Sequence, residues 1–182
     1  DIWMRLLCKV NGSVLWLSRS NEMSEKNMIK EAQKRDIDAS RLVFADQVPI
    51  NEHLARYKLA DLFIDTFYFN AHTTTTEALW AGLPVVTMQG KGFAARVAGS
   101  LLNAIGLPEL VTENVSDYEA LILEFATKPA KLGMIKEKLV ANRLSKPLFN
   151  SHLYTKHLES GYLNAYQNYF DGKDPENIFV TK

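Results

Sequence analysis

Short apolar runs recur along this chain at intervals of roughly 20 to 30 residues, and a segment with a helical pattern separates each run from the next. The runs cover residues 13–17, 41–44, 61–65, 84–88 and 109–111. Parallel strands need a crossover of about a dozen residues or more, usually a helix, so this alternation predicts parallel βαβ units. The runs are continuous rather than alternating, which indicates a sheet covered on both faces. The predicted fold is an α/β domain with a Rossmann-like, doubly wound parallel sheet.

The helical segments lie before, between and after these runs. They are expected at about 1–10, 24–36, from 51, 74–82, 94–103, from 116, 131–143 and 151–171. Ser24 is expected to open one of them, and Asn51 and Ser116 are the expected N-caps of two others. Residues 1–149 are expected to form the sheet domain and residues 150–182 a helical tail of the same domain.

Charge and cysteine content exclude several classes of protein. Lysine plus arginine and aspartate plus glutamate both number 21, so no global field attracts nucleic acid or an anionic membrane. No apolar run approaches the ~20 residues that a membrane span needs. Cys8 is the single cysteine, so no internal disulfide can form, and we expect a buried thiol. The first residues read as the inside of an amphipathic helix, which predicts a piece of a longer protein.

The loops that follow the strands are the places to look for a site, because ligands of such sheets bind beyond the carboxyl ends of the strands. After Ile64, the chain reads Asn-Ala-His-Thr-Thr-Thr-Thr-Glu over residues 70–77 and opens a helix. Free N–H groups at a helix start, with the hydroxyls of Thr73 and Thr74 and the ring of His72, suit a diphosphate. Glu77, one turn later, could accept bonds from two ribose hydroxyls. The alternative is a threonine-rich cap that merely starts a helix.

Two further loops add weaker candidates. His53 and Arg56 are three apart on a helix and share a face, so they could stack on a base and bond its carbonyl; Pro49 lies just before them. The alternative is a surface histidine and a solvated arginine. Gly90 and Lys91 belong to a Gly-x-Gly loop that lacks the third glycine of the dinucleotide motif, so a plain flexible loop is the alternative.

Other residues are given structural interpretations. His152 and His157 have no cysteine or carboxylate at metal-ligand spacing, so no metal site is predicted. Trp16 and Trp80 are expected in the core. Asp65 ends a strand and could project into the ligand crevice, but it is not counted among the candidates.

The residues from 42 to 149 resemble the C-terminal lobe of O-GlcNAc transferases, glycosyltransferase family 41, including the SPINDLY-like members. The resemblance is carried by residues 59–66, 70–74, 79–88, 95–98 and 145–150, and the run 13–17 also fits. It covers nearly the whole chain without large gaps.

This resemblance implies one half of a two-lobed GT-B glycosyltransferase. The family donor is UDP-N-acetylglucosamine, and the sugar passes to Ser or Thr of proteins with inversion and without an essential metal. By the same resemblance, His53 and Arg56 contact the uracil, residues 72–74 the diphosphate, and Glu77 the ribose, where familiar members have aspartate. A cytoplasmic, tetratricopeptide-associated protein is expected.

The chain departs from the family in ways that bear on activity. Ile50 stands where well-known members carry a lysine near the nucleotide. The catalytic lobe and the repeats that recruit protein acceptors are missing, so no catalytic residue is assigned and the chain alone is expected to be nearly inactive. The alternatives are another GT-B enzyme (a fucosyltransferase using GDP-fucose or a UDP-sugar epimerase) and a non-catalytic nucleotide-binding module. A dehydrogenase is disfavoured by the absent Gly-x-Gly-x-x-Gly.

The last predicted helix carries a broad apolar stripe. Its members are Tyr154, Leu158, Tyr162, Ala165, Tyr166 and Tyr169. In the full protein this stripe is expected to pack on the other lobe. In the isolated chain it is expected to be exposed or to pair two copies as a homo-oligomer.

Overall fold

Eight α-helices and five strands, with short 3-10 turns between them, make up the described chain, residues 1–180 of a computed structural model. The helices are α1 (Ile2–Lys9), α2 (Glu22–Gln33), α3 (Ile50–Arg56), α4 (Thr73–Ala81), α5 (Val97–Ala104), α6 (Val115–Thr127), α7 (Pro129–Arg143) and α8 (Ser151–Phe170). The strands are β1 (Leu15–Ser18), β2 (Leu42–Ala45), β3 (Phe63–Ile64), β4 (Val85–Met88) and β5 (Val111–Thr112). Each predicted element has a counterpart; residues 181 and 182 of the expected tail lie outside the described residues.

The two predicted helix caps, Asn51 and Ser116, and the helix start predicted at Ser24 were wrong. Asn21 caps α2 by accepting from the backbone N–H of Ser24, at 2.9 Å, and Asn114 caps α6 by accepting from that of Asp117 at 2.9 Å. At α3 the N-cap position is Pro49, whose side chain makes no capping bond. Asn21 and Asn114 are the caps because each stands directly before its helix, where its amide oxygen accepts from a first-turn N–H group.

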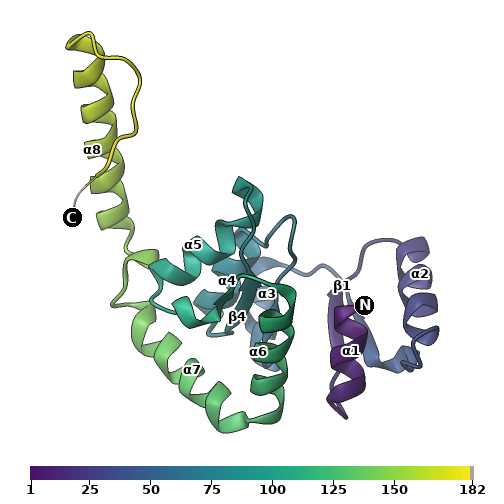
Figure 1. Cartoon of the computed structure of the whole chain (residues 1–182). Helices are drawn as coiled ribbons and strands as arrows, with labels where there is room; N and C mark the ends of the chain where they lie inside the picture. Colours follow the sequence, from purple (N-terminus) through teal and green to yellow (C-terminus); the bar gives the residue numbers. More distant parts are fainter. Residues whose placement is uncertain (181–182) are drawn as a thin grey trace.

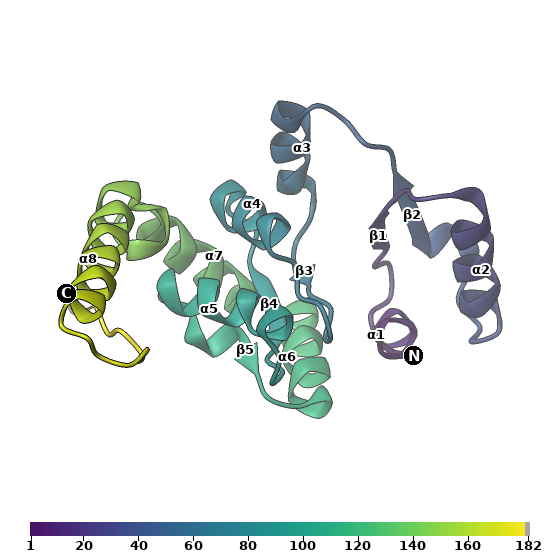
Figure 2. The same cartoon turned by 90° about the horizontal axis from the view of Figure 1, so that it is seen from above.

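All strand pairs are parallel, which confirms the predicted α/β class, but the strands form two sheets rather than one. β1 pairs with β2, and the second sheet has the order β3-β4-β5. Figures 1 and 2 show α1, α2 and the first sheet to one side of the remaining elements. Ile64 of β3 packs against the apolar cores of both sheets, so the two units meet there through side chains.

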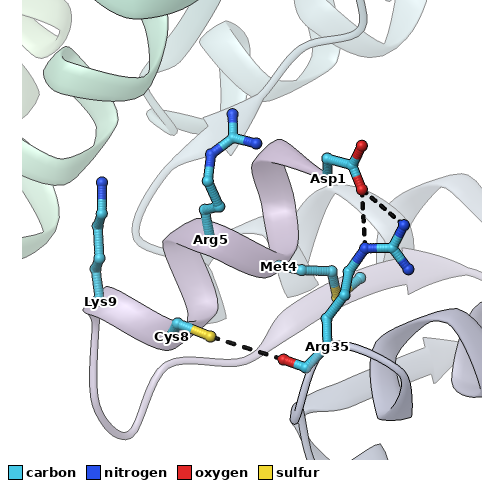
Figure 3. A pocket seen from close by; sticks show the side chains of 6 residues that line it. All are labelled: Asp1, Met4, Arg5, Cys8, Lys9 and Arg35. Atoms are coloured by element: carbon cyan, nitrogen blue, oxygen red, sulfur yellow. Dashed lines mark hydrogen bonds and ion pairs between the residues drawn. The ribbon is translucent and has the colours of Figure 1, made fainter.

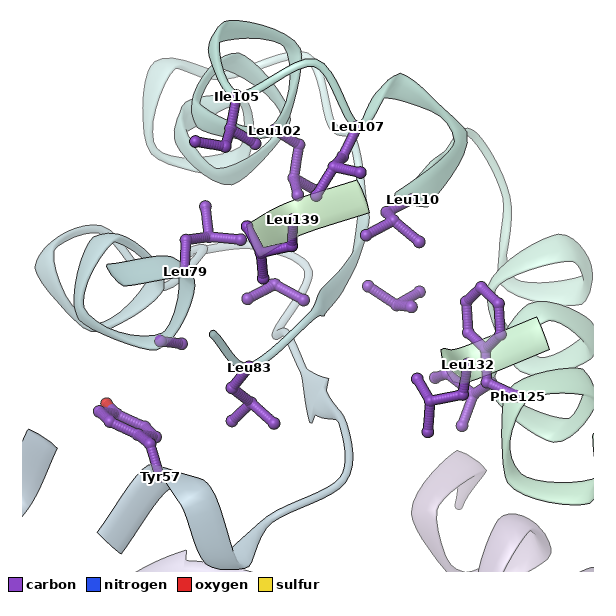
Figure 4. Packing of buried hydrophobic residues seen from close by; sticks show 14 of the residues in the cluster. Tyr57, Leu79, Leu83, Leu102, Ile105, Leu107, Leu110, Phe125, Leu132 and Leu139 are labelled. Atoms are coloured by element: carbon purple, nitrogen blue, oxygen red, sulfur yellow. The ribbon is translucent and has the colours of Figure 1, made fainter. Parts of the chain in front are cut away.

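The larger core surrounds β4. Val85, Val86 and Thr87 are fully buried, and α4, α5, α6 and α7 supply most of the side chains around them. Figure 4 shows part of this cluster, with Tyr57 at its edge. The buried face of α4 (Thr75, Ala78 and Leu79) anchors that helix, so its N-terminus is held in a fixed place. The smaller core comprises Met4, Leu7, Leu15, Ala32, Ile37 and Leu42.

Ion pairs connect the smaller unit to the larger one. Arg5 and Lys9 of α1 lie 2.7 and 3.3 Å from the carboxylate of Glu119 on α6. The hydrogen bond from Arg5 holds the pKa of Glu119 below its usual range.

Two predictions of burial were wrong. Cys8 is exposed, because α1 turns its other face, with Met4 and Leu7, to the core. Trp80 is 45% exposed; its ring lies against Phe149 and under the guanidinium of Arg143 at the surface. Trp16 is half-buried.

Helix α8 projects from the rest of the molecule, and residues 171–180 run back along it (Figure 1). None of its residues is buried, so the predicted stripe is exposed to solvent. None of the helices in residues 1–180 combines the length and the apolar character needed to cross a membrane.

Amide protons of α8 are expected to exchange with solvent at least ~100-fold faster than those of β4, because an isolated helix is marginal in water. Hydrogen exchange followed by mass spectrometry measures this. The internal control is α7, which buries Leu132 and Leu139 and should be protected. Equal protection of α7 and α8 would show that α8 is held by contacts the structure lacks.

Candidate functional site

The carboxylate of Asp65, directly after β3, organises the loop that leads into α4. Its Oδ1 accepts from the backbone N–H groups of Thr66 and Ala71 at 2.8 and 2.7 Å, and its Oδ2 accepts from the Thr87 hydroxyl at 2.6 Å. The Tyr118 hydroxyl donates to the Asp65 carbonyl at 2.7 Å. Burial raises the pKa of Asp65. Both carboxylate oxygens are thus occupied by protein groups, and Asp65 fixes the loop rather than facing a ligand.

The loops after β3 and β4 are joined to each other. The carbonyl of Ala94 accepts from the backbone N–H of Asn70 at 2.9 Å and lies 3.3 Å from Nε2 of His72. The N–H of Gly90 donates to the carbonyl of Ala95 at 2.8 Å, and a Cβ on Gly90 would lie 2.6 Å from that of Ala95. The absence of a side chain at Gly90 therefore lets the Ala95 side chain of the same loop pack against the backbone of residue 90. Lys91 is exposed at the tip.

The first turn of α4 offers uncapped backbone donors. His72 occupies the N-cap position but makes no side-chain capping bond, and Thr73 and Thr74 are exposed beside it. The first N–H groups of a helix have no partner within the helix, and its positive end attracts anions. Close by in sequence, Asn70 Oδ1 and Thr75 Oγ1 are buried without a hydrogen-bond partner. These backbone donors make the turn a candidate site for an anion.

The ring of His72 is held between two aromatic side chains. It stacks on Phe69, with ring centres 4.7 Å apart and planes 14° apart, and meets Phe93 edge-on at 6.2 Å. Phe69 and Phe93 are themselves exposed, so an aromatic surface borders the helix start.

The candidate base-binding residues of α3 contact one another and α4. Nη2 of Arg56 lies 2.8 Å from Nδ1 of His53, and Nε2 of His53 lies 3.3 Å from the Glu77 carboxylate and 3.1 Å from the Tyr57 hydroxyl. Arg56 also donates to the Asp46 carbonyl at 2.7 Å, and its guanidinium lies over the Trp16 ring at 5.9 Å. The carbonyl of exposed Pro49 accepts from the His53 N–H at 2.9 Å.

The structure thus brings His53, Arg56 and Glu77 together. His72, Thr73 and Thr74 lie one turn earlier on α4. Arg56 and Glu77 contact protein groups where ligand atoms were expected. Tyr57 was not singled out as a site residue, although its position four residues after His53 on one helix was a usable signal. No group of three or more metal-ligating side chains gathers within residues 1–180.

Two surface hollows lie away from these loops. The first, of about 330 Å³, borders α1, and Figure 3 shows the Cys8 thiol directed at the Arg35 carbonyl there, 3.9 Å away. Its lining residues are Asp1, Met4, Arg5, Cys8, Lys9 and Arg35. The second, of about 450 Å³, is lined by Glu109, Thr112, Asp117, Ala120, Leu121 and Glu124. We place the candidate site at the strand ends and not in these hollows, because their charged groups are paired with one another or with neighbouring side chains.

Parallel strands alternating with helices, with polar loops at the strand ends, make this chain a Rossmann-like α/β domain. An O-GlcNAc transferase mutant from Thermobaculum terrenum superimposes with a TM-score of 0.84 at 28% identity, covering 89% of this chain and 32% of that one. Residues 1–158 match the family model of glycosyl transferase family 41, and the chain belongs to that family.

Curated relatives carry transferase names. The chain is 34% identical to the probable UDP-N-acetylglucosamine–peptide N-acetylglucosaminyltransferase SEC of Arabidopsis thaliana, over 100% of this chain and 19% of the relative. The corresponding enzyme of Caenorhabditis elegans is 34% identical, over 98% and 16%. A SPINDLY protein of Hordeum vulgare is 29% identical, over 96% and 19%. The chain therefore spans less than a fifth of the length of these relatives.

Proposed function

We propose that this chain is the donor-binding lobe of a protein O-GlcNAc transferase, which moves N-acetylglucosamine from UDP-GlcNAc to Ser or Thr hydroxyls. The observation that carries the proposal is the uncapped first turn of α4, with exposed Thr73 and Thr74, beside the His53 and Glu77 pair. The names of the two relatives at 34% identity support the donor and the protein acceptor.

In this proposal the nucleotide lies along α4. The diphosphate binds the N–H groups and hydroxyls of Thr73 and Thr74, the ribose hydroxyls bind Glu77, and the uracil contacts His53 and Arg56. Transfer leaves negative charge on the departing UDP, and oriented N–H dipoles at the α4 N-terminus stabilise that charge. The helix and hydroxyls, rather than a metal ion, supply this stabilisation.

We further propose that transfer needs more of the protein than this chain. The chain spans 19% of its SEC relative, and a lobe with half a cleft neither positions an acceptor nor excludes water. The 182-residue chain is therefore expected to bind nucleotide without transferring sugar.

Calorimetric titration with UDP, GDP and UDP-GlcNAc tests the proposed site. We expect UDP to bind more tightly than GDP. Thr74→Val should weaken UDP about 3–10-fold by removing one hydrogen bond, and His53→Ala should weaken it about 10-fold or more. His152→Ala, an exposed histidine on α8, is the matched control and should bind as the wild type does. Tighter binding of GDP would favour the GDP-fucose alternative. Equal UDP affinity in all four proteins would contradict the site.

A further inference from the structure

The proton position on His53 follows from its partners. Arginine is always charged and only donates, so Nδ1 of His53 accepts the hydrogen bond from Nη2 of Arg56, at 2.8 Å. The neutral imidazole therefore carries its hydrogen on Nε2.

That single Nε2 hydrogen faces two acceptors. The Tyr57 hydroxyl oxygen lies 3.1 Å from Nε2 and the Glu77 carboxylate 3.3 Å from it. The two acceptors belong to different elements: Tyr57 lies in the turn after α3, and Glu77 lies on α4.

The two acceptors differ in their freedom to move. Tyr57 is buried in the larger core and its ring meets that of His53 edge-on at 4.8 Å. Burial raises the pKa of Tyr57 to about 12, so its hydroxyl stays neutral and available at neutral pH. Glu77 is partly exposed on α4, and its carboxylate can turn toward solvent.

We infer that Tyr57 is a positioning residue of the nucleotide site, whose hydroxyl keeps the Nε2 hydrogen bond of His53 when Glu77 turns to the ribose of a nucleotide. The inference rests on the proposed function of the same site. With Tyr57 in place, Glu77 is released without stranding a half-buried N–H, and the imidazole keeps its tautomer and its ring plane. Without the Tyr57 hydroxyl, the Nε2–H group of His53 loses its hydrogen bond whenever Glu77 turns to the ribose. The free energy of that lost hydrogen bond lowers the affinity for nucleotide.

Nitrogen-15 NMR of the His53 ring in the ligand-free chain tests the network independently of any nucleotide. The expected result is the Nε2–H tautomer in the wild type. An Nδ1–H tautomer would overturn the inference, since Arg56 could not then donate to Nδ1.

Titration of Tyr57→Phe tests the role in binding. UDP affinity should fall about 3–10-fold, while pyrophosphate, which reaches only the α4 N-terminus, should bind as it does to the wild type. Thermal unfolding of Tyr57→Phe checks that the ring still fills the core, and Tyr162→Phe on exposed α8 is the matched control.

A double-mutant cycle separates positioning from general packing. If Tyr57 acts by releasing Glu77, Tyr57→Phe should cost nothing further in the Glu77→Ala background. Losses of UDP affinity that add in the double variant would overturn the role of Tyr57 but not the proposed function. The same holds if the wild type binds UDP and Tyr57→Phe binds it equally well. A wild type that binds no UDP would overturn the proposed function, and the positioning role with it, whatever the tautomer shows.

Discussion

Replacing Asp65 by alanine is expected to lower the free energy of unfolding by about 3–5 kcal/mol. The change strands two backbone N–H groups and the Thr87 hydroxyl, all of which donate to the buried carboxylate. The loop between β3 and α4 should lose its fixed path as well. Urea unfolding at pH 7, followed by circular dichroism, measures the loss. A change below about 1 kcal/mol would mean that these donors find other partners.

Asp65→Asn is the matched control, because the amide keeps the shape and an oxygen for the two N–H groups while the Thr87 hydroxyl turns to accept. Burial raises the pKa of Asp65 in the folded protein. The stability linked to its proton is fully present below the usual pKa of about 3.9 and is lost as pH rises through the raised value. Asparagine lacks this loss, so Asp65→Asn should gain stability relative to the wild type between pH 4 and pH 7. A difference independent of pH would contradict the raised pKa.

Gly90→Ala is expected to destabilise the protein by about 1–3 kcal/mol, since the new Cβ would lie 2.6 Å from that of Ala95. The clash is relieved only if the loop of residues 90–95 moves. That movement also shifts the Ala94 carbonyl, which accepts a hydrogen bond from the Asn70 N–H. Urea unfolding again gives the magnitude.

Gly92→Ala, two residues away, separates crowding from the general effect of losing a glycine. A Cβ on Gly92 meets nothing within 4 Å, so stability should stay within about 0.5 kcal/mol of the wild type. Similar losses in both variants would show that crowding against Ala95 is not the cause.

Sequence periodicity predicted the parallel α/β class, because short apolar runs separated by helices have few other solutions. It placed helix starts less well, since Asn21 and Ser24 both suit a cap and only the folded geometry selects one. The division into two sheets was not predictable, because pairing of β1 with a further strand depends on tertiary packing. The exposure of Trp80 was not predictable either, because it also depends on tertiary packing.

For the site, the sequence pointed to the loops after the strands, and the structure brings His53 and Glu77 within 3.3 Å; nucleotide binding there stays a prediction. It could not reveal that protein groups occupy Arg56 and Glu77, since those partners come from distant segments. Tyr57 was not singled out from the sequence, and Asp65, which ends a strand, was not counted among the candidates; its bonds to Thr66, Ala71 and Thr87 appear only in the folded chain. Metal independence, protein acceptors, self-association and a cytoplasmic location stay predictions.

The two separate cores bear on how the chain melts. Ion pairs to Glu119, contacts at Ile64 and the side chain of Leu6 attach the β1–β2 unit to the rest of the chain. Because α1 buries Leu6 in the larger core, local opening of this unit would withdraw Leu6 from that core. Opening would take Trp16 and Asp46 away from Arg56. A nucleotide held by both Arg56 and α4 would oppose that opening, because a ligand that binds only the closed form stabilises it by mass action. A bound nucleotide would then make the two parts of the chain unfold together.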